Sequence, residues 1–315
     1  MSRCIVGVLL LLSISLCGIR AEEHASVEDA VRKLGDADPL KRCAATESLL
    51  AAREAARSPL ETAAKSGSSD VKSRAATLLK ALDVEPQLAK TVVALTSGKT
   101  MACDFEVTRV KGVFKGQFSG HTDSERYVSD VKIPTPAGDI DMHITADGTN
   151  VWSEWIQPLD GQKIVQKFLA TTMLKMGSSD HLNPVDCLRD VQSRFVFTGV
   201  HAHKAGGELN VYEGVPKDGA LDRQIKWIEE LGGAAMAKGM RTERESMVRA
   251  RLTFAKDALR KIELTGANDE PLFALTLSYV KLGVQLDEKS FTYSPPKDVE
   301  VFDMEEQLKT TREHK

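Results

Sequence analysis

The sequence is poor in cysteine, and the spacing of the few it has argues against two common uses of that residue. Of the five cysteines, Cys4 and Cys17 lie in an apolar run near the N-terminus, which leaves Cys43, Cys103 and Cys187. This odd number without C-x-x-C spacing favours neither a disulfide framework nor a zinc site. Two alternatives stay open for Cys103 and Cys187: a single disulfide between them, or buried free thiols.

The sequence also lacks the motifs of the common enzyme classes. It contains no G-x-S-x-G, no H-E-x-x-H and no glycine-rich dinucleotide loop. The pair His201 and His203 has no third metal ligand at a useful spacing, and we interpret both as exposed turn histidines. Asp139, Asp141 and His143 alternate along one strand face, which we expect to meet water. We therefore expect no enzymatic activity, no catalytic residue, no metal and no cofactor.

An excess of positive charge is missing as well. Residues 1–21 carry Arg3 and Arg20 and no acidic residue, so without them the 42 basic and 45 acidic residues become 40 and 45, a net charge of −5. This balance argues against nucleic-acid binding.

Only one long apolar run is present, from Cys4 to Cys17, preceded by Arg3 and followed by Gly18 to Ala21. This layout is typical of a secretory signal peptide, and the run is shorter than the roughly 20 residues of a membrane-spanning helix. We expect residues 1–21 to be removed and the chain to be exported. The alternative is lipidation at Cys17, because Ile14 to Cys17 resembles a bacterial lipobox.

Residues 25–83 are rich in Ala, Leu, Arg and Lys at helical spacing and predict helices. Residues 38–45 are echoed by residues 69–76, with Arg42 and Arg74 in register, and this echo resembles short HEAT-like repeats. We interpret residues 22–86 as a HEAT-like helical segment that ends in a linker, residues 84–86. Its apolar face needs a cover, which is either the following domain or a protein partner.

From Met101 onward the hydrophobic pattern has a period of two, which predicts strands with one buried face. Turn residues at Gly112, Gly120 and Gly148 separate about five consecutive strands of a large antiparallel sheet that curls. We predict an α+β fold, in which this strongly curved sheet forms a half-open β-barrel, plugged by short helices and preceded by a small all-α segment.

The stretch from Arg249 to Asp303 predicts an antiparallel meander, because period-two runs alternate with turn-forming residues. Its alternation places Phe273, Leu275, Leu277 and Tyr279 on one face. A last strand is predicted around Phe291 and Tyr293 and stopped by Pro295 and Pro296, which donate no ladder hydrogen bond.

Three helical stretches interrupt the predicted strands. They cover residues 168–176, a helix that Asn183 caps and Pro184 begins, and an insertion at about 220–248 with Gly232-Gly233 as a stop. We expect the first two to pack into the concave side of the sheet.

In this order the stretches resemble the superfamily of the periplasmic outer-membrane lipoprotein carrier. The resemblance covers residues 87–304, which would form the carrier-like β domain, followed by a charged tail at 305–315. The segment before residue 86 is not part of that pattern, and the insertion at 220–248 is larger than the pattern has. The similar stretches are Thr145 to Trp152 (a D-G-x-x-x-W-like hairpin), Asn183 to Leu188, Leu259 to Glu263, and Phe291 to Val301 with its aromatic-x-aromatic-x-Pro-Pro ending.

The resemblance implies a periplasmic lipid- or lipoprotein-binding protein whose apolar cavity holds acyl chains and carries or senses lipidated cargo. Alternation places the candidate lining residues on the apolar side of their strands or helices. The alternative is a non-catalytic envelope scaffold that binds a protein partner through residues 25–83. The candidate lining residues are Phe105, Phe114, Phe118, Tyr127, Met142, Trp155, Leu174 and Leu188.

We predict that the mature chain begins after residue 21 with Cys17 removed, because Ala21 is a small residue suited to the position before a signal-peptide cut. N-terminal sequencing of exported protein should read from Glu22. A blocked N-terminus with an acylated Cys17 would instead make the protein a membrane-tethered one.

Overall fold

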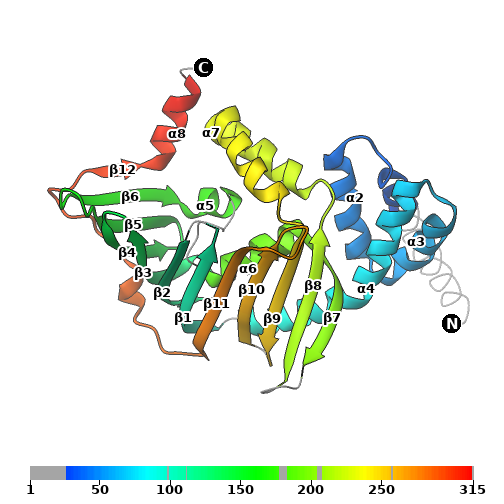
Figure 1. Ribbon diagram of the computed structural model, residues 1–315, viewed down its shortest axis with the longest axis horizontal. Helices are drawn as coiled ribbons and strands as arrows, with labels where there is room; N and C mark the ends of the chain where they lie inside the picture. The colour runs from blue at the N-terminus through cyan, green and yellow to red at the C-terminus, as the bar shows by residue number, and fades with distance from the viewer. Residues whose placement is uncertain are drawn as a thin grey trace, which may run out of the picture.

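The computed structural model describes residues 26–97, 99–110, 112–176, 183–203, 208–256 and 258–313, so the predicted signal peptide lies outside the described residues. Residues 26–33 are helical, and α2 (Pro39–Ala52), α3 (Glu54–Ser66) and α4 (Ser69–Thr96) follow (Figure 1). Asp38 caps α2 by accepting a hydrogen bond of 2.9 Å from the Leu40 amide. Ser68 caps α4. Helices therefore precede the sheet.

The predicted linker at residues 84–86 is not a linker in the structure, because these residues lie inside α4. Pro86 lacks an amide hydrogen and ordinarily interrupts a helix. Here Val84 and Leu88 on either side of it are buried in the core of the sheet, and this burial offsets the missing hydrogen bond. The first half of α4 packs instead in the helical core, through residues such as Ala75 and Leu78.

Twelve strands form one open sheet, whose two ends, β12 and β7, are not paired with each other. Its order is β12-β6-β5-β4-β3-β2-β1-β11-β10-β9-β8-β7, and all neighbours are antiparallel except β12 and β6. The predicted α+β class with a large open sheet is confirmed. The strands are β1 (Thr100–Arg109), β2 (Gly112–His121), β3 (Arg126–Thr135), β4 (Gly138–Asp147), β5 (Asn150–Ile156), β6 (Lys163–Leu169), β7 (Phe195–His203), β8 (Leu209–Pro216), β9 (Arg249–Ala255), β10 (Ala258–Thr265), β11 (Pro271–Leu282) and β12 (Val301–Asp303).

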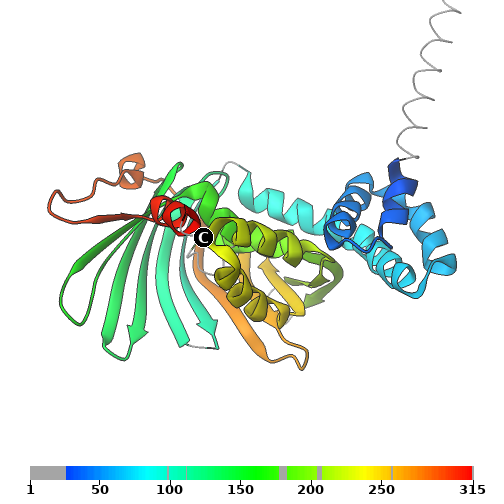
Figure 2. The same cartoon turned by 90° about the horizontal axis from the view of Figure 1, so that it is seen from above.

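The sheet consists of two antiparallel meanders, β1–β6 and β7–β11, joined where β1 pairs with β11. This pairing aligns Phe105 with Leu277 and Val107 with Leu275, so the apolar sides of both meanders form one continuous face. The second half of α4 and the helix α6 (Pro184–Arg194) pack on that face (Figures 1 and 2). We call it the apolar face and the opposite one the polar face.

Three local predictions differ from the structure. No strand forms at Phe291 and Tyr293; instead a 3-10 turn, η2 (Glu288–Phe291), buries Phe291, and the chain continues to β12. Tyr279 is 77% exposed and does not follow Leu277 into the core, because the register between β1 and β11 shifts next to it and its φ is +51°. Residues 168 and 169, predicted helical, still belong to β6.

The remaining helices are α5 (Ala170–Met176), α7 (Ala220–Glu245) and α8 (Met304–Glu313). As the glycine pair predicts, the helix of the insertion is interrupted at Gly233, whose φ of +82° is left-handed. Ile228 of the first half and Ala237 of the second are buried together in a small cluster. The two halves of α7 therefore pack on each other.

The helical segment is docked on the sheet domain through a carboxylate that both echoed arginines contact. Asp218, between β8 and α7, accepts hydrogen bonds from Arg42 at 2.9 and 3.0 Å and from Arg74 Nε. The two guanidinium groups hold the pKa of Asp218 below its ordinary value, although partial burial opposes this. The neighbouring Gly219 lies so close to the Pro39 carbonyl that a Cβ there would stand 1.8 Å from its oxygen.

The outer edge of β7 is also covered from α4. The Phe197 amide donates a 2.9 Å hydrogen bond to Glu85 Oε1, and burial raises the pKa of Glu85. An unpaired strand edge is a hazard for aggregation, and α4 satisfies part of it.

Cys43, Cys103 and Cys187 are buried, and none of the three is part of a disulfide. Burial raises the pKa of the Cys103 thiol to about 12. Among the described residues, no helix combines the length and the hydropathy needed to cross a membrane.

We predict that Asp218→Asn lowers the free energy of unfolding by about 2 kcal/mol, because it leaves two poorly exposed guanidinium groups without their carboxylate. Urea denaturation measures the change. Asp29→Asn, in an exposed pair with Lys33, is the matched control and should leave the midpoint unchanged. Equal stability of Asp218→Asn and the parent would show that the clamp contributes nothing.

Candidate functional site

The predicted lining residues of the strands lie on the apolar face, and Leu188 of α6 packs against it, but they do not share one environment. Phe105, Phe118, Tyr127 and Leu188 are 0–3% exposed and belong to the main core. The rings of Phe118 and Tyr127 pack with their centroids 5.7 Å apart. The side chain of Leu174 lies outside the described residues. Ligand binding by these residues stays a prediction.

The other predicted residues, Phe114, Met142 and Trp155, are only half-buried. The sheet register aligns Met142 with Trp155, and Trp155 with Ile164 of β6. Further half-buried apolar residues flank this row on the same face. We call the group the half-buried patch, and its members are Phe114, Ile133, Ile140, Met142, Trp155 and Ile164.

Ile133, Ile140 and Ile164 of the patch are not among the lining residues that the sequence predicts. A signal for Ile164 was present, since Ile164, Gln166 and Phe168 alternate with Lys163, Val165 and Lys167 as strand residues do. The alternation predicts on which face of the sheet a side chain lies. It does not predict which part of that face a helix covers.

Helix α6 packs on the core of the apolar face, and its position is set by its own two sides. Asn183 caps it by accepting a 2.9 Å hydrogen bond from the Val185 amide, as predicted. Its apolar side, Val185, Leu188 and Val191, is buried in the core of the sheet. Its polar side starts with Asp186, whose side chain is only 4% exposed.

Asp186 belongs to an ion-pair network that ties α6 to the loop between β2 and β3. Arg189 Nη1 lies 3.0 Å from Asp186 and 2.9 Å from Glu125, and Arg189 Nη2 donates to the Thr122 carbonyl at 3.1 Å. Burial, and then the neighbouring Glu125 carboxylate, raise the pKa of Asp186 to about 7 against the opposing effect of Arg189. The protonation of this network therefore changes near neutral pH.

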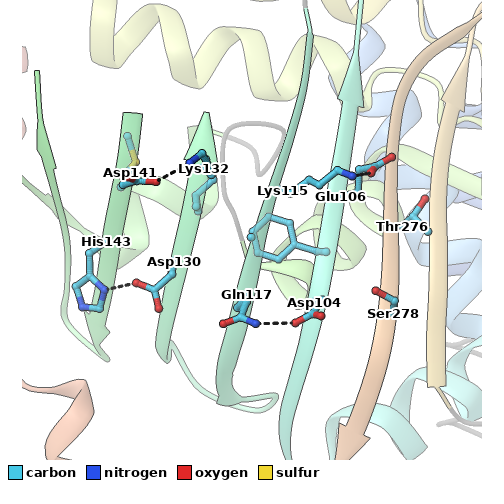
Figure 3. A pocket seen from close by; sticks show the side chains of 14 residues that line it. Asp104, Glu106, Lys115, Gln117, Asp130, Lys132, Asp141, His143, Thr276 and Ser278 are labelled. Atoms are coloured by element: carbon cyan, nitrogen blue, oxygen red, sulfur yellow. Dashed lines mark hydrogen bonds and ion pairs between the residues drawn. The ribbon is translucent and has the colours of Figure 1, made fainter. Parts of the chain in front are cut away.

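The polar face carries an open groove of 640 Å³ across β11, β1, β2, β3 and β4 (Figure 3). Its charged side chains are largely paired across the strands: Lys115 lies 2.9 Å from Glu106, and Lys132 lies 3.1 Å from Asp139. Gln117 donates to Asp104 at 3.0 Å. As predicted from their alternation, Asp139, Asp141 and His143 are exposed here.

One triplet in the groove has the order of a nucleophile, a base and an acid. His143 Nδ1 lies 2.7 Å from Asp130 Oδ1, and its Nε2 lies 3.2 Å from the Thr145 hydroxyl. A nucleophile must reach its substrate, whereas Thr145 is 2% exposed. This triplet therefore offers no accessible nucleophile, and we interpret it as a cross-strand hydrogen-bond network.

His201 and His203 are exposed at the end of β7, and His201 lies 3.5 Å from Glu213. In the part of the chain that the structure describes, no group of three or more His, Cys, Asp or Glu side chains is placed to hold a metal ion.

Comparison with protein-family models and with curated protein sequences gave no match. Among solved structures, the chain is similar to an uncharacterized conserved protein from Thermus thermophilus, with 12% identity and a TM-score of 0.39 over 70% of this chain and 99% of that one. It is also similar to a chain of the Pseudomonas aeruginosa MucA/MucB complex, with 11% identity and a TM-score of 0.34 over 67% and 61%.

A further structure is a putative outer membrane lipoprotein-sorting protein domain from Vibrio parahaemolyticus, with 11% identity and a TM-score of 0.26 over 65% of this chain and 94% of that one. At these scores the similarities carry no argument about function.

We predict that Asp186→Asn flattens the pH dependence of stability. Because the folded pKa of about 7 exceeds the ordinary 3.8, the folded state binds more protons here, so stability falls as pH rises from about 4 to 7. Relative to the parent, the variant should gain at least about 1 kcal/mol between pH 5 and pH 8. Urea denaturation at both values measures it, with the exposed Asp123→Asn as control. An unchanged difference would contradict the assigned shift.

Proposed function

We propose that this chain is a non-enzymatic, exported protein of the cell envelope that binds the acyl chains of a lipid or lipoprotein on the apolar face of its sheet. The half-buried patch carries this proposal. Its six residues stand on five adjacent strands, β2 to β6, and are neither buried in the core nor fully exposed.

Apolar contact alone is sufficient for such binding. Burial of hydrocarbon yields about 0.8 kcal/mol per methylene group, so one long acyl chain supplies on the order of 10 kcal/mol before the cost of ordering it. No charged or catalytic group is required. This fits a face on which Phe114, Met142, Trp155 and their neighbours supply flexible and aromatic contact surface.

The resemblance to the carrier superfamily supports a more specific proposal. The proposed location of the protein is the periplasm, and its proposed role is to carry or sense lipidated cargo. The same resemblance leaves residues 22–86 unexplained, and their HEAT-like assignment stays a prediction.

A second candidate function is a scaffold that binds a protein partner through the helical segment. One observation favours it. A groove of 510 Å³ lies between residues 26–33, α3 and α4, and is lined in part by Val31, Pro59, Ala63 and Val71. Small apolar side chains of this kind suit a helix or an extended peptide.

The two functions differ in what the protein carries. Native mass spectrometry of protein purified from its own envelope should detect bound lipid if the first function holds. Protein without lipid but with a stoichiometric polypeptide partner would favour the scaffold.

We predict that Met142→Glu lowers the affinity for a fluorescent fatty-acyl probe at least about tenfold, or about 1.4 kcal/mol. The charge would sit in the middle of the half-buried patch, where water can still solvate it, so the loss of folding stability should be much smaller than the loss in a packed core. Probe titration and urea denaturation measure the two effects. Met142→Leu conserves volume and apolarity and should bind the probe as the parent does.

Loss of folding in Met142→Glu together with no probe binding by the parent would contradict acyl binding. The apolar face would then be core only, and the scaffold function would be favoured.

A further inference from the structure

Exposed apolar side chains gather at one end of the sheet. β1 and β2, β3 and β4, and β5 and β6 are joined by hairpins whose ends all lie at the same end of the strands, because the six strands form a meander. Val110 at the first of these ends is 75% exposed, and Val113 just after it is 41% exposed. At the third, Ile156 and Leu159 are 59% and 77% exposed. These four make up half of the eight large apolar residues that are strongly exposed among the described residues.

The three hairpin ends form a line. The second and third are in contact range, since a Cβ on Gly138 would lie 3.5 Å from Pro158. With neighbouring strands about 4.8 Å apart, the line from the first end to the third is roughly 20 Å long. In Figure 2 the strands of this half of the sheet splay side by side. The exposed apolar side chains thus stand on separate projections along one rim.

Several backbone polar groups at these hairpin ends are hydrogen-bonded within the protein and do not depend on water. In the third end, the Gln157 amide donates to the Gln162 carbonyl at 2.8 Å and the Gly161 amide donates to the Gln157 carbonyl at 2.9 Å. Asp160 accepts from the Gln162 amide at 2.9 Å. Pro158 has no amide hydrogen at all. An unpaired amide is costly in an apolar medium, so internal pairing lowers the cost of insertion.

The second hairpin end shows the same internal pairing. The Thr135 hydroxyl donates to the Gly138 carbonyl, and the Ala137 amide donates back to that hydroxyl at 3.3 Å. Pro134 and Pro136 remove two further donors. Internal hydrogen bonding of the backbone matters more at a lipid surface than at a hydrated protein interface, because no water replaces a lost hydrogen bond in lipid.

The rim adjoins the half-buried patch. Trp155 directly precedes Ile156, and Ile164 directly follows Lys163 at the start of β6. Because successive strand residues alternate, Ile156 and Lys163 themselves point to the polar face, and the rim lies where the two faces meet. An acyl chain that leaves a bilayer at the rim would meet the patch within one or two residues along the strands.

From these observations we propose that the three hairpin ends, residues 109–110, 135–138 and 156–163, dock on the surface of a lipid bilayer with Val110, Ile156 and Leu159 inserted at the headgroup–acyl boundary. This docking proposal extends the proposed acyl-binding function and rests on it, because docking serves a protein that takes up acyl chains. Asp139 and Asp160 keep the insertion shallow, since carboxylates remain in the headgroup region.

Charge contributes little to this docking. Lys115, Lys132 and Lys163 near the rim are already paired with Glu106, Asp139 and Glu154, and the Arg109 guanidinium lies over the rings of Phe114 and Phe273. These side chains do not form a basic patch of the kind that recognises anionic lipid. Binding should therefore be equal on neutral and anionic vesicles.

The test is co-sedimentation of the full chain with vesicles of phosphatidylcholine alone and of phosphatidylcholine mixed with phosphatidylglycerol. The parent should bind both equally. The double variant Val110→Ser/Leu159→Ser should bind about tenfold more weakly, and both sites are exposed enough that folding is unaffected. The control Val93→Ser/Val215→Ser removes exposed apolar residues at 59% and 37% elsewhere and should bind as the parent does.

Absence of vesicle binding by the parent, or equal loss in both double variants, would overturn the docking proposal. Uptake of the soluble acyl probe separates the two proposals. A parent that takes up the probe but ignores vesicles keeps the acyl-binding function without the docking. A parent that binds vesicles through the rim but takes up no probe keeps the docking, and then acyl binding fails.

Discussion

Burial of α4 in two hydrophobic cores at once is the constraint on which the arrangement of the molecule depends. Ala75 and Leu78 of its first half pack among the other N-terminal helices, and Val84 and Leu88 of its second half pack on the sheet. Because one continuous helix belongs to both cores, the two parts cannot turn against each other without exposing apolar surface. The hydrogen bonds from Arg42 and Arg74 to Asp218 add a polar contact between the two parts, just before α7.

The same helix, together with α6, determines where the apolar face is core and where it is surface. Where α4 and α6 pack on the sheet the side chains are buried, as Phe105 of β1 and Leu188 of α6 show. Toward the hairpin ends of β2 to β6 the face is no longer fully covered, and residues such as Met142 and Trp155 are half-buried. The proposed binding surface thus arises from incomplete coverage of an ordinary sheet, without specialised residues, so no catalytic or metal motif in the sequence would mark it.

The period-two alternation was enough to predict most of the strands, the open α+β sheet and the buried faces of Phe105, Phe118 and Tyr127, but it also predicted a strand at Phe291 and Tyr293 that does not form. Features that depend on a distant partner were not predictable: Tyr279 leaves the core because of a register shift against β1, and residues 84–86 stay helical because the sheet buries Val84 and Leu88. The limits of the half-buried patch depend on which helix lies over which strand. Local patterns carry no information about that, so the alternation of residues 163–168 indicates the face of Ile164 but not its place in the patch.

The central pairing of β1 with β11 has a consequence for the order in which the chain can fold. The paired residues Phe105 and Leu277 are separated by most of the polypeptide, and contacts between such distant residues form slowly. Until residue 282 has been synthesised, β1 is an unpaired edge strand of the first meander. Such an edge is a template for association with other chains. Truncation that removes β11 (Pro271–Leu282) should therefore be far more harmful to this protein than the distance of β11 from the half-buried patch suggests, and termination before this strand would leave an aggregation-prone half-sheet.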